Sequence, residues 1–188
     1  LRIMDQRPEI LEELQRGKFD SLLELARWGH RVGTDMVDLL LIHLELDEVE
    51  TLPRLAYAVH TEIGCPISLD SRNPDALEAA LAELRPYKAL INSVTAEQES
   101  LETLLPIARR YGAAIVGMPI GHRYGLPKTA EGRLEESRVI LEAAEGIGIP
   151  RDDVVIDAIC LASSAEPGSM QATLRTLKML HEELGVAT

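Results

Sequence analysis

Short aliphatic runs alternate with longer amphipathic stretches along the chain, and this alternation limits the possible folds more than any other feature. Each run is almost continuously apolar, which is typical of a parallel strand buried on both faces. The runs are residues 35–42, 66–70, 88–94, 113–118 and 153–160. The helix patterns that accompany them are residues 8–31, 49–63, 74–84, 98–111, 130–146 and 169–184. With a short strand expected at residues 1–4, we predict about six βα units.

Repeated βα units form either an open, doubly wound sheet or a closed (β/α)8 barrel. The sequence contains neither Gly-x-Gly-x-x-Gly after a predicted strand nor Gly-x-x-x-x-Gly-Lys-Ser/Thr, so it lacks the nucleotide-binding motifs of the open sheet. We therefore predict an α/β fold of the (β/α)8 TIM-barrel class. A complete barrel has eight units and about 250 residues, and a seventh strand should begin at residues 185–188. We expect residues 1–188 to form a single barrel domain that is C-terminally incomplete, without strands 7 and 8.

The composition excludes several classes of partner. Among 188 residues, 19 are Lys or Arg and 31 are Asp or Glu, for a formal net charge of −12. Nucleic acids and anionic membranes bind basic surfaces, so we expect neither as a partner. Two cysteines are too few for a disulfide framework or a four-cysteine metal site. Because no basic segment followed by an apolar one opens the chain, we expect a cytoplasmic protein.

Polar residues stand at equivalent places in three of the predicted strands. Asp70 ends the run 66–70, Asn92 follows Ala-Leu-Ile in the run 88–94, and Asp157 follows Val-Val-Ile in the run 153–160. In a barrel, the carboxyl ends of the strands converge on the functional site. Two carboxylates and a carboxamide there can bind the edge of a flat heterocycle that carries N–H, NH₂ and C=O groups. The alternative is that these side chains cap helices or bind loop amides.

Two histidines raise the separate possibility of a metal-dependent hydrolase. His43 and His122 each follow a predicted strand and, with Asp70 and Asp157, could imitate such a site. However, the sequence contains no His-x-His and no His-Glu-x-x-His pairing, which are the spacings expected of metal ligands. We therefore predict no metal site.

The motifs around these strands resemble the pterin-binding family, which includes dihydropteroate synthase, and within it the methyltetrahydrofolate:corrinoid methyltransferase branch. The resemblance runs from about Gly33 to the C-terminus. It is carried by Pro66-Ile-Ser-Leu-Asp-Ser-Arg-Asn-Pro74, Lys88-Ala-Leu-Ile-Asn-Ser-Val-Thr-Ala-Glu97, Tyr111-Gly-Ala-Ala-Ile-Val-Gly-Met118, Gly125-Leu-Pro-Lys128 and Asp153-Val-Val-Ile-Asp157.

The resemblance implies a site and an activity. By it, Asp70, Asn92 and Asp157 hydrogen-bond the pterin ring, and Met118 belongs to the same substrate-binding site. The implied activity, in one-carbon metabolism, moves the N5-methyl of methyltetrahydrofolate to or from a cobalt corrinoid (cobalamin) on a separate corrinoid protein, with tetrahydrofolate as the other form of the substrate. We expect a homodimer. The family's Asn near N5 belongs to strand 7, which we expect to lie beyond this chain, so the catalytic residue is unknown.

Two alternatives remain. The first is a dihydropteroate synthase-like enzyme, although the Gly-, Ser/Thr- and Arg-rich loop of that branch has no counterpart at residues 42–48. The second is a non-catalytic pterin-binding fragment, which the missing seventh strand favours.

Overall fold

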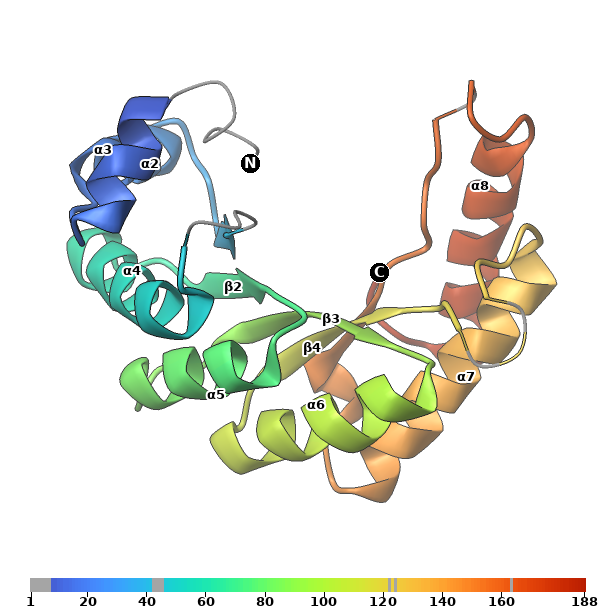
Figure 1. Ribbon diagram of the computed structural model, residues 1–188. Helices are drawn as coiled ribbons and strands as arrows, with labels where there is room; N and C mark the ends of the chain where they lie inside the picture. The colour runs from blue at the N-terminus through green and yellow to red at the C-terminus, as the bar shows by residue number, and fades with distance from the viewer. Residues whose placement is uncertain (1–7, 42–45, 122, 124, 163) are drawn as a thin grey trace. The chain divides into compact units, whose positions relative to one another are not determined.

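The computed structural model (Figure 1) describes residues 8–41, 46–121, 123, 125–162 and 164–188. The chain forms two compact units, Leu1–Ile91 and Asn92–Thr188. Its sheet has five strands in the order β1-β2-β3-β4-β5, which is also their order along the chain. A helix follows each strand. Strands in chain order, each followed by a helix, are the arrangement of a βα-barrel wall, and the predicted α/β class is confirmed.

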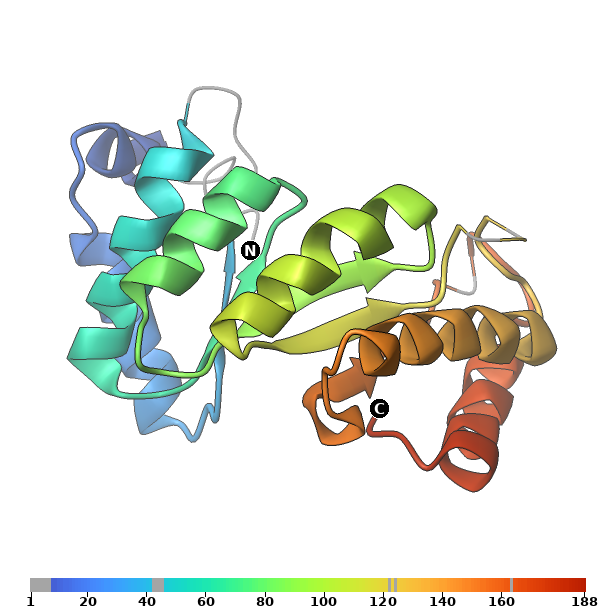
Figure 2. The ribbon, with the colours of Figure 1, turned by 90° about the horizontal axis from the view of Figure 1, so that it is seen from below.

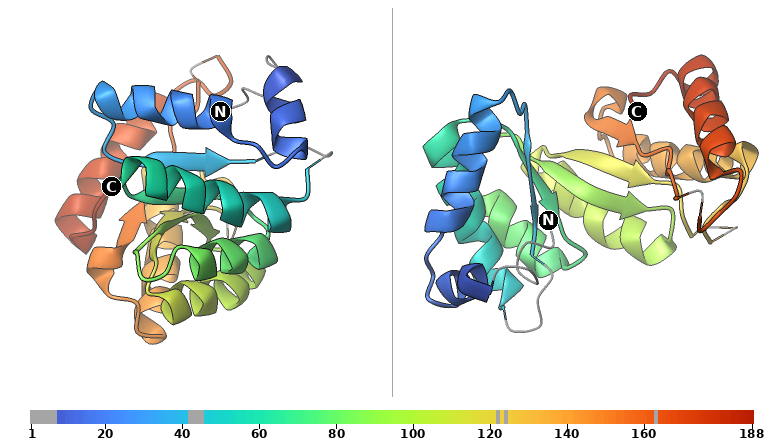
Figure 3. Two further views of the ribbon diagram at one scale, coloured as in Figure 1. Left: turned by 90° about the vertical axis from the view of Figure 1, so that its left-hand side faces the viewer. Right: turned by 90° about the horizontal axis from the view of Figure 1, so that it is seen from above.

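The first unit contains the β1–β2 pair and its helices. Its elements are α2 (Pro8–Gln15), α3 (Asp20–Arg31), β1 (Val37–Leu40), α4 (Glu48–Ile63), β2 (Ile67–Asp70) and α5 (Pro74–Glu83). The two strands are parallel, with Val37 opposite Ile67 and Leu40 opposite Asp70. The left view of Figure 3 shows β1 between α3 and α4. Helix α5 begins where the Asn73 side chain accepts hydrogen bonds from two backbone amides of its first turn, as an N-cap does.

The predicted single helix over residues 8–31 is wrong, because the structure has two helices there. Helix α2 ends at Gln15 and α3 begins at Asp20. Between them Gly17 adopts a φ of 67°, a left-handed conformation that glycine reaches without steric cost and that interrupts a right-handed helix. The Glu13 carboxylate joins the two helices by accepting hydrogen bonds from the backbone amide and hydroxyl of Ser21.

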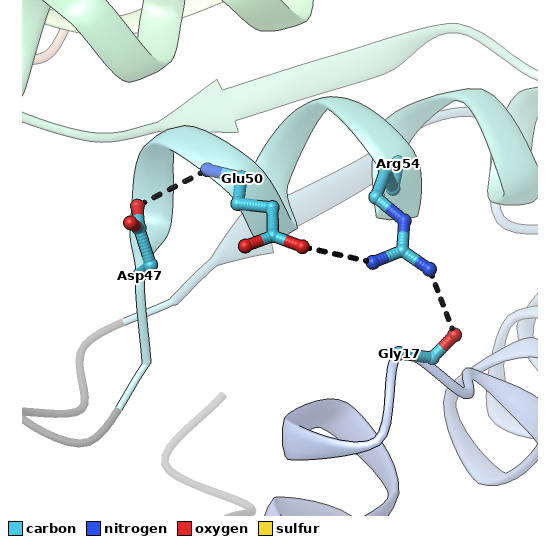
Figure 4. Close-up of polar contacts among 4 residues, drawn as sticks. All are labelled: Gly17, Asp47, Glu50 and Arg54. Carbon is cyan, nitrogen blue, oxygen red and sulfur yellow. Dashed lines mark hydrogen bonds and ion pairs between the residues drawn. The ribbon is translucent and has the colours of Figure 1, made fainter.

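Helix α4 is fastened to the turn between α2 and α3, as Figure 4 shows. Asp47 caps the helix by accepting the Glu50 N–H at 3.2 Å. One turn further on, Arg54 donates to the Glu50 carboxylate at 3.4 Å and to the carbonyl oxygen of Gly17 at 3.2 Å. A Cβ on Gly17 would lie 2.5 Å from the Arg54 guanidinium, so a side chain there would displace this flexible, exposed group from its present position.

The second unit holds the remaining strands and helices. They are the greater part of β3 (Leu90–Thr95), α6 (Gln98–Tyr111), β4 (Ala114–Met118), α7 (Ala130–Gly146), the 3-10 turn η1 (Arg151–Asp153), β5 (Val154–Ile156), α8 (Ser169–Met179) and the π-helical turn η2 (Leu180–Leu184). Strands β4 and β5 are parallel, and Gly117 lies opposite Ile156. Figure 2 shows α7 running alongside β4. Helix α6 ends at Tyr111, and the next residue, Gly112, takes a left-handed φ of 65°, which closes the last turn.

The sheet continues beyond β5. Ala187 forms a parallel bridge with Val155, and the Ile156 N–H donates to the Ala187 carbonyl at 2.8 Å. This isolated pairing lies at residues 185–188, where we expect a seventh strand to begin.

Most other predicted boundaries agree with the structure. Helices α6 and α7 begin and end at the predicted residues. The run 153–160 is a strand only over Val154–Ile156, because the chain turns away directly after Asp157. The strand predicted at residues 1–4 lies outside the described residues. In the described part of the chain, no helix has the length and apolarity needed to cross a membrane.

Candidate functional site

Asp157 and Met118 lie next to each other at the carboxyl ends of β5 and β4. The Asp157 N–H donates to the Gly117 carbonyl at 3.0 Å, which extends the pairing of the two strands by one residue past Ile156. Met118 is the last residue of β4. Both residues therefore lie at the edge of the sheet where the functional groups of a βα barrel gather.

The two side chains lie on the face of the β4–β5 pair that does not contact α7. A Cβ on Gly117 would be 2.7 Å from the Cδ1 of Ile156 and 3.1 Å from the Cγ2 of Ile140, which belongs to α7. Gly117 and Ile156 thus face α7, and the alternation of side chains along a strand places Met118 and Asp157 on the opposite face. Asp157 is exposed and Met118 is half-buried, so a ligand on this face can reach both.

Asn92 belongs to β3, the neighbour of β4 in the sheet order. Its side chain is half-buried, whereas Ile91 is fully buried, and the alternation of the strand puts these two side chains on opposite faces. Just beyond the strands, the Ala96 N–H donates to the Ile120 carbonyl at 2.9 Å. The second unit therefore carries three of the four residues expected in the site, on neighbouring strands.

Asp70 is the fourth residue, and it belongs to the first unit. It ends β2 and is half-buried. In the register of β1 and β2, Asp38 lies opposite Ser68, and Leu40 lies opposite Asp70. Because side chains two residues apart share a face, Asp38, Ser68 and Asp70 all lie on one face of this strand pair.

The environment of Asp70 disfavours its negative charge. Partial burial raises the pKa of the Asp70 carboxyl above its ordinary value, and the nearby carboxylates of Asp38 and Glu48 raise it further. Burial removes water from the ionised form, and like charges repel it. A carboxyl in such a position gains from a ligand that donates hydrogen bonds to it.

Asp157 also binds a loop amide, as the alternative interpretation of the strand-end residues expects. Its Oδ1 accepts the backbone N–H of Ile159 at 2.8 Å. A carboxylate has about four acceptor positions on its two oxygens, so this single hydrogen bond leaves capacity for a ligand. The amide contact and ligand binding are therefore compatible.

Two residues near the site escaped the sequence analysis. Asp38 lies inside a predicted apolar strand, and the argument that singled out Asp70 applies to it equally. Arg133 is 1% exposed, although an arginine in an amphipathic helix is expected on the solvent face. Its spacing could have revealed it, because Ala130, Ser137 and Ile140 lie three, four and seven residues away on the buried stripe of the same helix.

The described residues contain no group of three or more His, Cys, Asp or Glu side chains able to hold a metal ion. His43 and His122, the two histidines considered as metal ligands, lie outside the described residues.

A separate groove of about 570 Å³ lies in the first unit, lined by α3, β1 and α4. Asp38 is the one charged side chain among the described residues that line it, and Trp28 on α3 is 57% exposed. Asp70 is not part of its lining. The apolar lining of the groove suits packing against another apolar surface better than recognition of a polar heterocycle.

Asn92 lies within β3 and not at its carboxyl end, because the strand continues to Thr95. A parallel sheet in chain order, with a helix after each strand and carboxylates at the carboxyl ends of β2 and β5, defines a protein of the βα-barrel class. The sequence matches the family described as pterin binding enzymes over residues 9–188, and the chain belongs to that family.

Relatives of similar sequence carry methyltransferase names. The chain is 25% identical over 171 residues to methionine synthase of Mycobacterium tuberculosis, a match that covers 87% of this chain and 14% of the relative. It is 24% identical over 146 residues to methylcorrinoid:tetrahydrofolate methyltransferase of Eubacterium limosum, covering 75% of this chain and 53% of the relative. The chain therefore spans about half, or much less, of the length of these relatives.

Solved structures of similar fold include dihydropteroate synthases. The enzyme from Vibrio fischeri ES114 superposes with a TM-score of 0.65 at 20% identity, covering 89% of this chain and 65% of the other. The enzyme from Yersinia pestis, solved with a pterine–sulfa conjugate, gives 0.61 at 13% identity, covering 88% and 63%. At these identities the likeness shows the fold alone.

Proposed function

We propose that this chain binds the pterin ring of a reduced folate through Asp70, Asn92 and Asp157, with Met118 against the ring. The observation that carries the proposal is the place of Asp157, whose exposed carboxylate lies beside Met118 at the carboxyl ends of two paired strands. Membership of the pterin-binding family supports the same ligand class. The proposal treats the two units as parts of one barrel domain.

The chemistry of the three polar side chains suits the edge of a pterin. An ionised carboxylate accepts hydrogen bonds and cannot donate them, so Asp70 and Asp157 match ring N–H and NH₂ donors. The Asn92 carboxamide both donates and accepts, so it matches a ring carbonyl and a neighbouring N–H. A ligand that donates hydrogen bonds to Asp70 stabilises the ionised carboxylate, which burial and the neighbouring carboxylates disfavour.

For the activity, we propose transfer of a methyl group between N5 of tetrahydrofolate and the cobalt of a corrinoid on a separate protein. When methyltetrahydrofolate is the donor, the bond from N5 to the methyl carbon would break, its electron pair would stay on N5, and N5 would take up a proton. Cobalt(I) of the corrinoid would supply the electron pair of the new cobalt–carbon bond and so become cobalt(III). The part of this chain is to hold the ring in a fixed orientation, which turns a bimolecular encounter into an oriented one. The names of two relatives support this activity over that of dihydropteroate synthase. We assign no residue of this chain to N5.

Calorimetric titration of the full chain tests the proposal directly. We expect saturable, one-to-one binding of 5-methyltetrahydrofolate and of tetrahydrofolate. A parallel titration with 6-hydroxymethyl-7,8-dihydropterin pyrophosphate distinguishes the alternatives. A chain that bound this dihydropterin ester tightly and neither folate would be a dihydropteroate synthase-like enzyme. Cobalt(I) consumption, followed by absorbance with a corrinoid protein, then separates a methyltransferase from a non-catalytic pterin-binding protein.

A further inference from the structure

Arg133 is a buried cation whose hydrogen bonds all run to one small region of the second unit. Its guanidinium donates to the carbonyl oxygens of Pro127 (3.1 Å), Ala158 (2.9 Å) and Ile159 (2.7 Å) and to the hydroxyl of Thr173 (3.1 Å). Burial lowers the pKa of the Arg133 guanidinium, but the group stays protonated at any physiological pH. A buried charge is costly unless its donors are satisfied, and here neutral carbonyls satisfy them.

Two of the three carbonyls that Arg133 binds, those of Ala158 and Ile159, belong to the turn directly after Asp157. In this turn Ile159 adopts a φ of 54°, a left-handed conformation that is rare for a β-branched residue. This conformation places the Ile159 N–H 2.8 Å from Oδ1 of Asp157. The surrounding structure must therefore hold Ile159 in place for the hydrogen bond to Asp157 to form.

Thr173 of α8 holds the same turn from a second helix. Its hydroxyl lies 2.7 Å from the Ile159 carbonyl and 2.8 Å from the Ser169 carbonyl, and it accepts from Arg133. The single hydroxyl proton is shared between the two carbonyls. The Ile159 carbonyl is thus bound by side chains from both α7 and α8, two helices that contact each other.

We propose that Arg133 and Thr173 are positioning residues for the Asp157 carboxylate, acting through the Ile159 amide. Neither side chain needs to touch the ligand. They hold the turn so that the Ile159 N–H orients Oδ1 and leaves the remaining oxygen positions of Asp157 for the ring. This inference rests on the proposed function, because it assigns Asp157 to pterin binding.

Thr173→Val provides the test, with Thr176→Val as its matched control. Both threonines lie on α8, and the hydroxyl of each donates to the carbonyl four residues earlier. Thr173 donates to Ser169 at 2.8 Å, and Thr176 donates to Ala172 at 2.7 Å. Only Thr173 reaches the turn after Asp157. Thr→Val keeps the shape and removes the hydroxyl, and it is gentler than replacement of Arg133, which could prevent folding altogether.

We expect Thr173→Val to raise the Kd for 5-methyltetrahydrofolate about tenfold in calorimetric titration. Thr176→Val and the conservative Thr173→Ser should stay within about twofold of the wild type. In an Asp157→Ala background, Thr173→Val should cause no further loss, because its effect passes through Asp157. An equal loss with and without Asp157 would mean that Thr173 acts by general destabilisation, and this would overturn the inference.

Amide hydrogen exchange supplies a readout that does not depend on the ligand. The Ile159 amide should lose protection in Thr173→Val and in Asp157→Ala, and keep it in Thr176→Val. Full protection of this amide in Thr173→Val would overturn the inference even if the wild type binds the pterin. No binding of any pterin by the wild-type chain would instead overturn the proposed function, and with it the role given to Asp157.

Discussion

Asp38 of β1 accepts a 2.5 Å hydrogen bond from the hydroxyl of Ser68, the residue directly opposite it on β2. Ser68 is 3% exposed, so its hydroxyl cannot turn to bulk water. Asp70, two residues further along β2, lies on the same face, and the Asp38 charge contributes to its raised pKa. Two carboxylates on one face of a strand pair repel each other, which destabilises the fold but suits a ligand rich in N–H donors.

The raised pKa of Asp70 predicts that Asp70→Asn stabilises the protein at neutral pH. A carboxyl whose folded pKa lies above its unfolded value binds protons more tightly in the folded state. The contribution of Asp70 to the stability of the fold is therefore fully present below pH 3.8, the ordinary pKa of an aspartate, and is lost as pH rises through the folded pKa. Asparagine cannot ionise and escapes this loss. The free energy of unfolding of the variant, measured by urea denaturation, should therefore rise relative to that of the wild type as pH increases from about 4 to 7.

Asp75→Asn is the control for this pH profile. Asp75 is exposed in the first turn of α5, where a negative charge interacts favourably with the helix dipole. Its replacement should therefore leave the stability unchanged or slightly lower it. If Asp70→Asn were no more stable than the wild type at pH 7, neither burial nor the charge of Asp38 would disfavour the ionised Asp70 carboxylate to a measurable degree.

Pterin affinity should fall when either strand-end carboxylate is removed. Asp157→Ala and Asp70→Ala each leave ring donors unpaired, which costs roughly 1–3 kcal/mol, or about 5- to 150-fold in Kd for 5-methyltetrahydrofolate. Asp152→Ala is a matched control, since this exposed aspartate lies in η1, at the amino end of β5. Wild-type affinity in both folded variants would remove these residues from the site.

The sequence predicted the fold class and most elements because their determinants are local. Buried strands such as Ile67–Asp70 read as apolar runs, and caps such as Asn73 before Pro74 mark where helices begin. The break at Gly17 was missed because the apolar periodicity continues across it. The end of β5 was placed too late because apolar residues continue past Asp157 through Ala158 and Ile159, although they leave the sheet.

The candidate site could be predicted only in part, for a physical reason. The position of a polar residue at a strand end is readable from the chain, and Asp70, Asn92 and Asp157 were found in this way. The support around Asp157 depends on Arg133 and Thr173, whose contacts span 26 and 14 residues of chain to Ile159. No local pattern predicts such contacts, and the φ of Ile159 follows from them.

Removal of metal ions should leave pterin binding unchanged. The described residues provide no cluster of metal ligands, and three carboxylate or carboxamide side chains can bind the ring without one. We therefore expect the same Kd for 5-methyltetrahydrofolate before and after dialysis against EDTA. Stoichiometric zinc or iron that survives purification and is required for binding would instead support a metal-dependent hydrolase.

The packing of β4 on α7 predicts opposite effects for two glycine substitutions. At Gly117 a new Cβ would lie 2.7 Å from the Cδ1 of Ile156 and 3.1 Å from the Cγ2 of Ile140. Both neighbours are 0% exposed and cannot move aside, so Gly117→Ala should destabilise the protein by about 1–3 kcal/mol.

Gly146, the last residue of α7, is the matched control, because a Cβ there would meet nothing within 4 Å. Gly146→Ala should therefore stabilise the protein by up to about 1 kcal/mol through its higher helix propensity. Thermal and urea unfolding of both variants measure these effects. If Gly117→Ala were as stable as Gly146→Ala, Gly117 would not pack against Ile156 and α7. The argument that places Met118 and Asp157 together on the opposite, ligand-accessible face would then lose its basis.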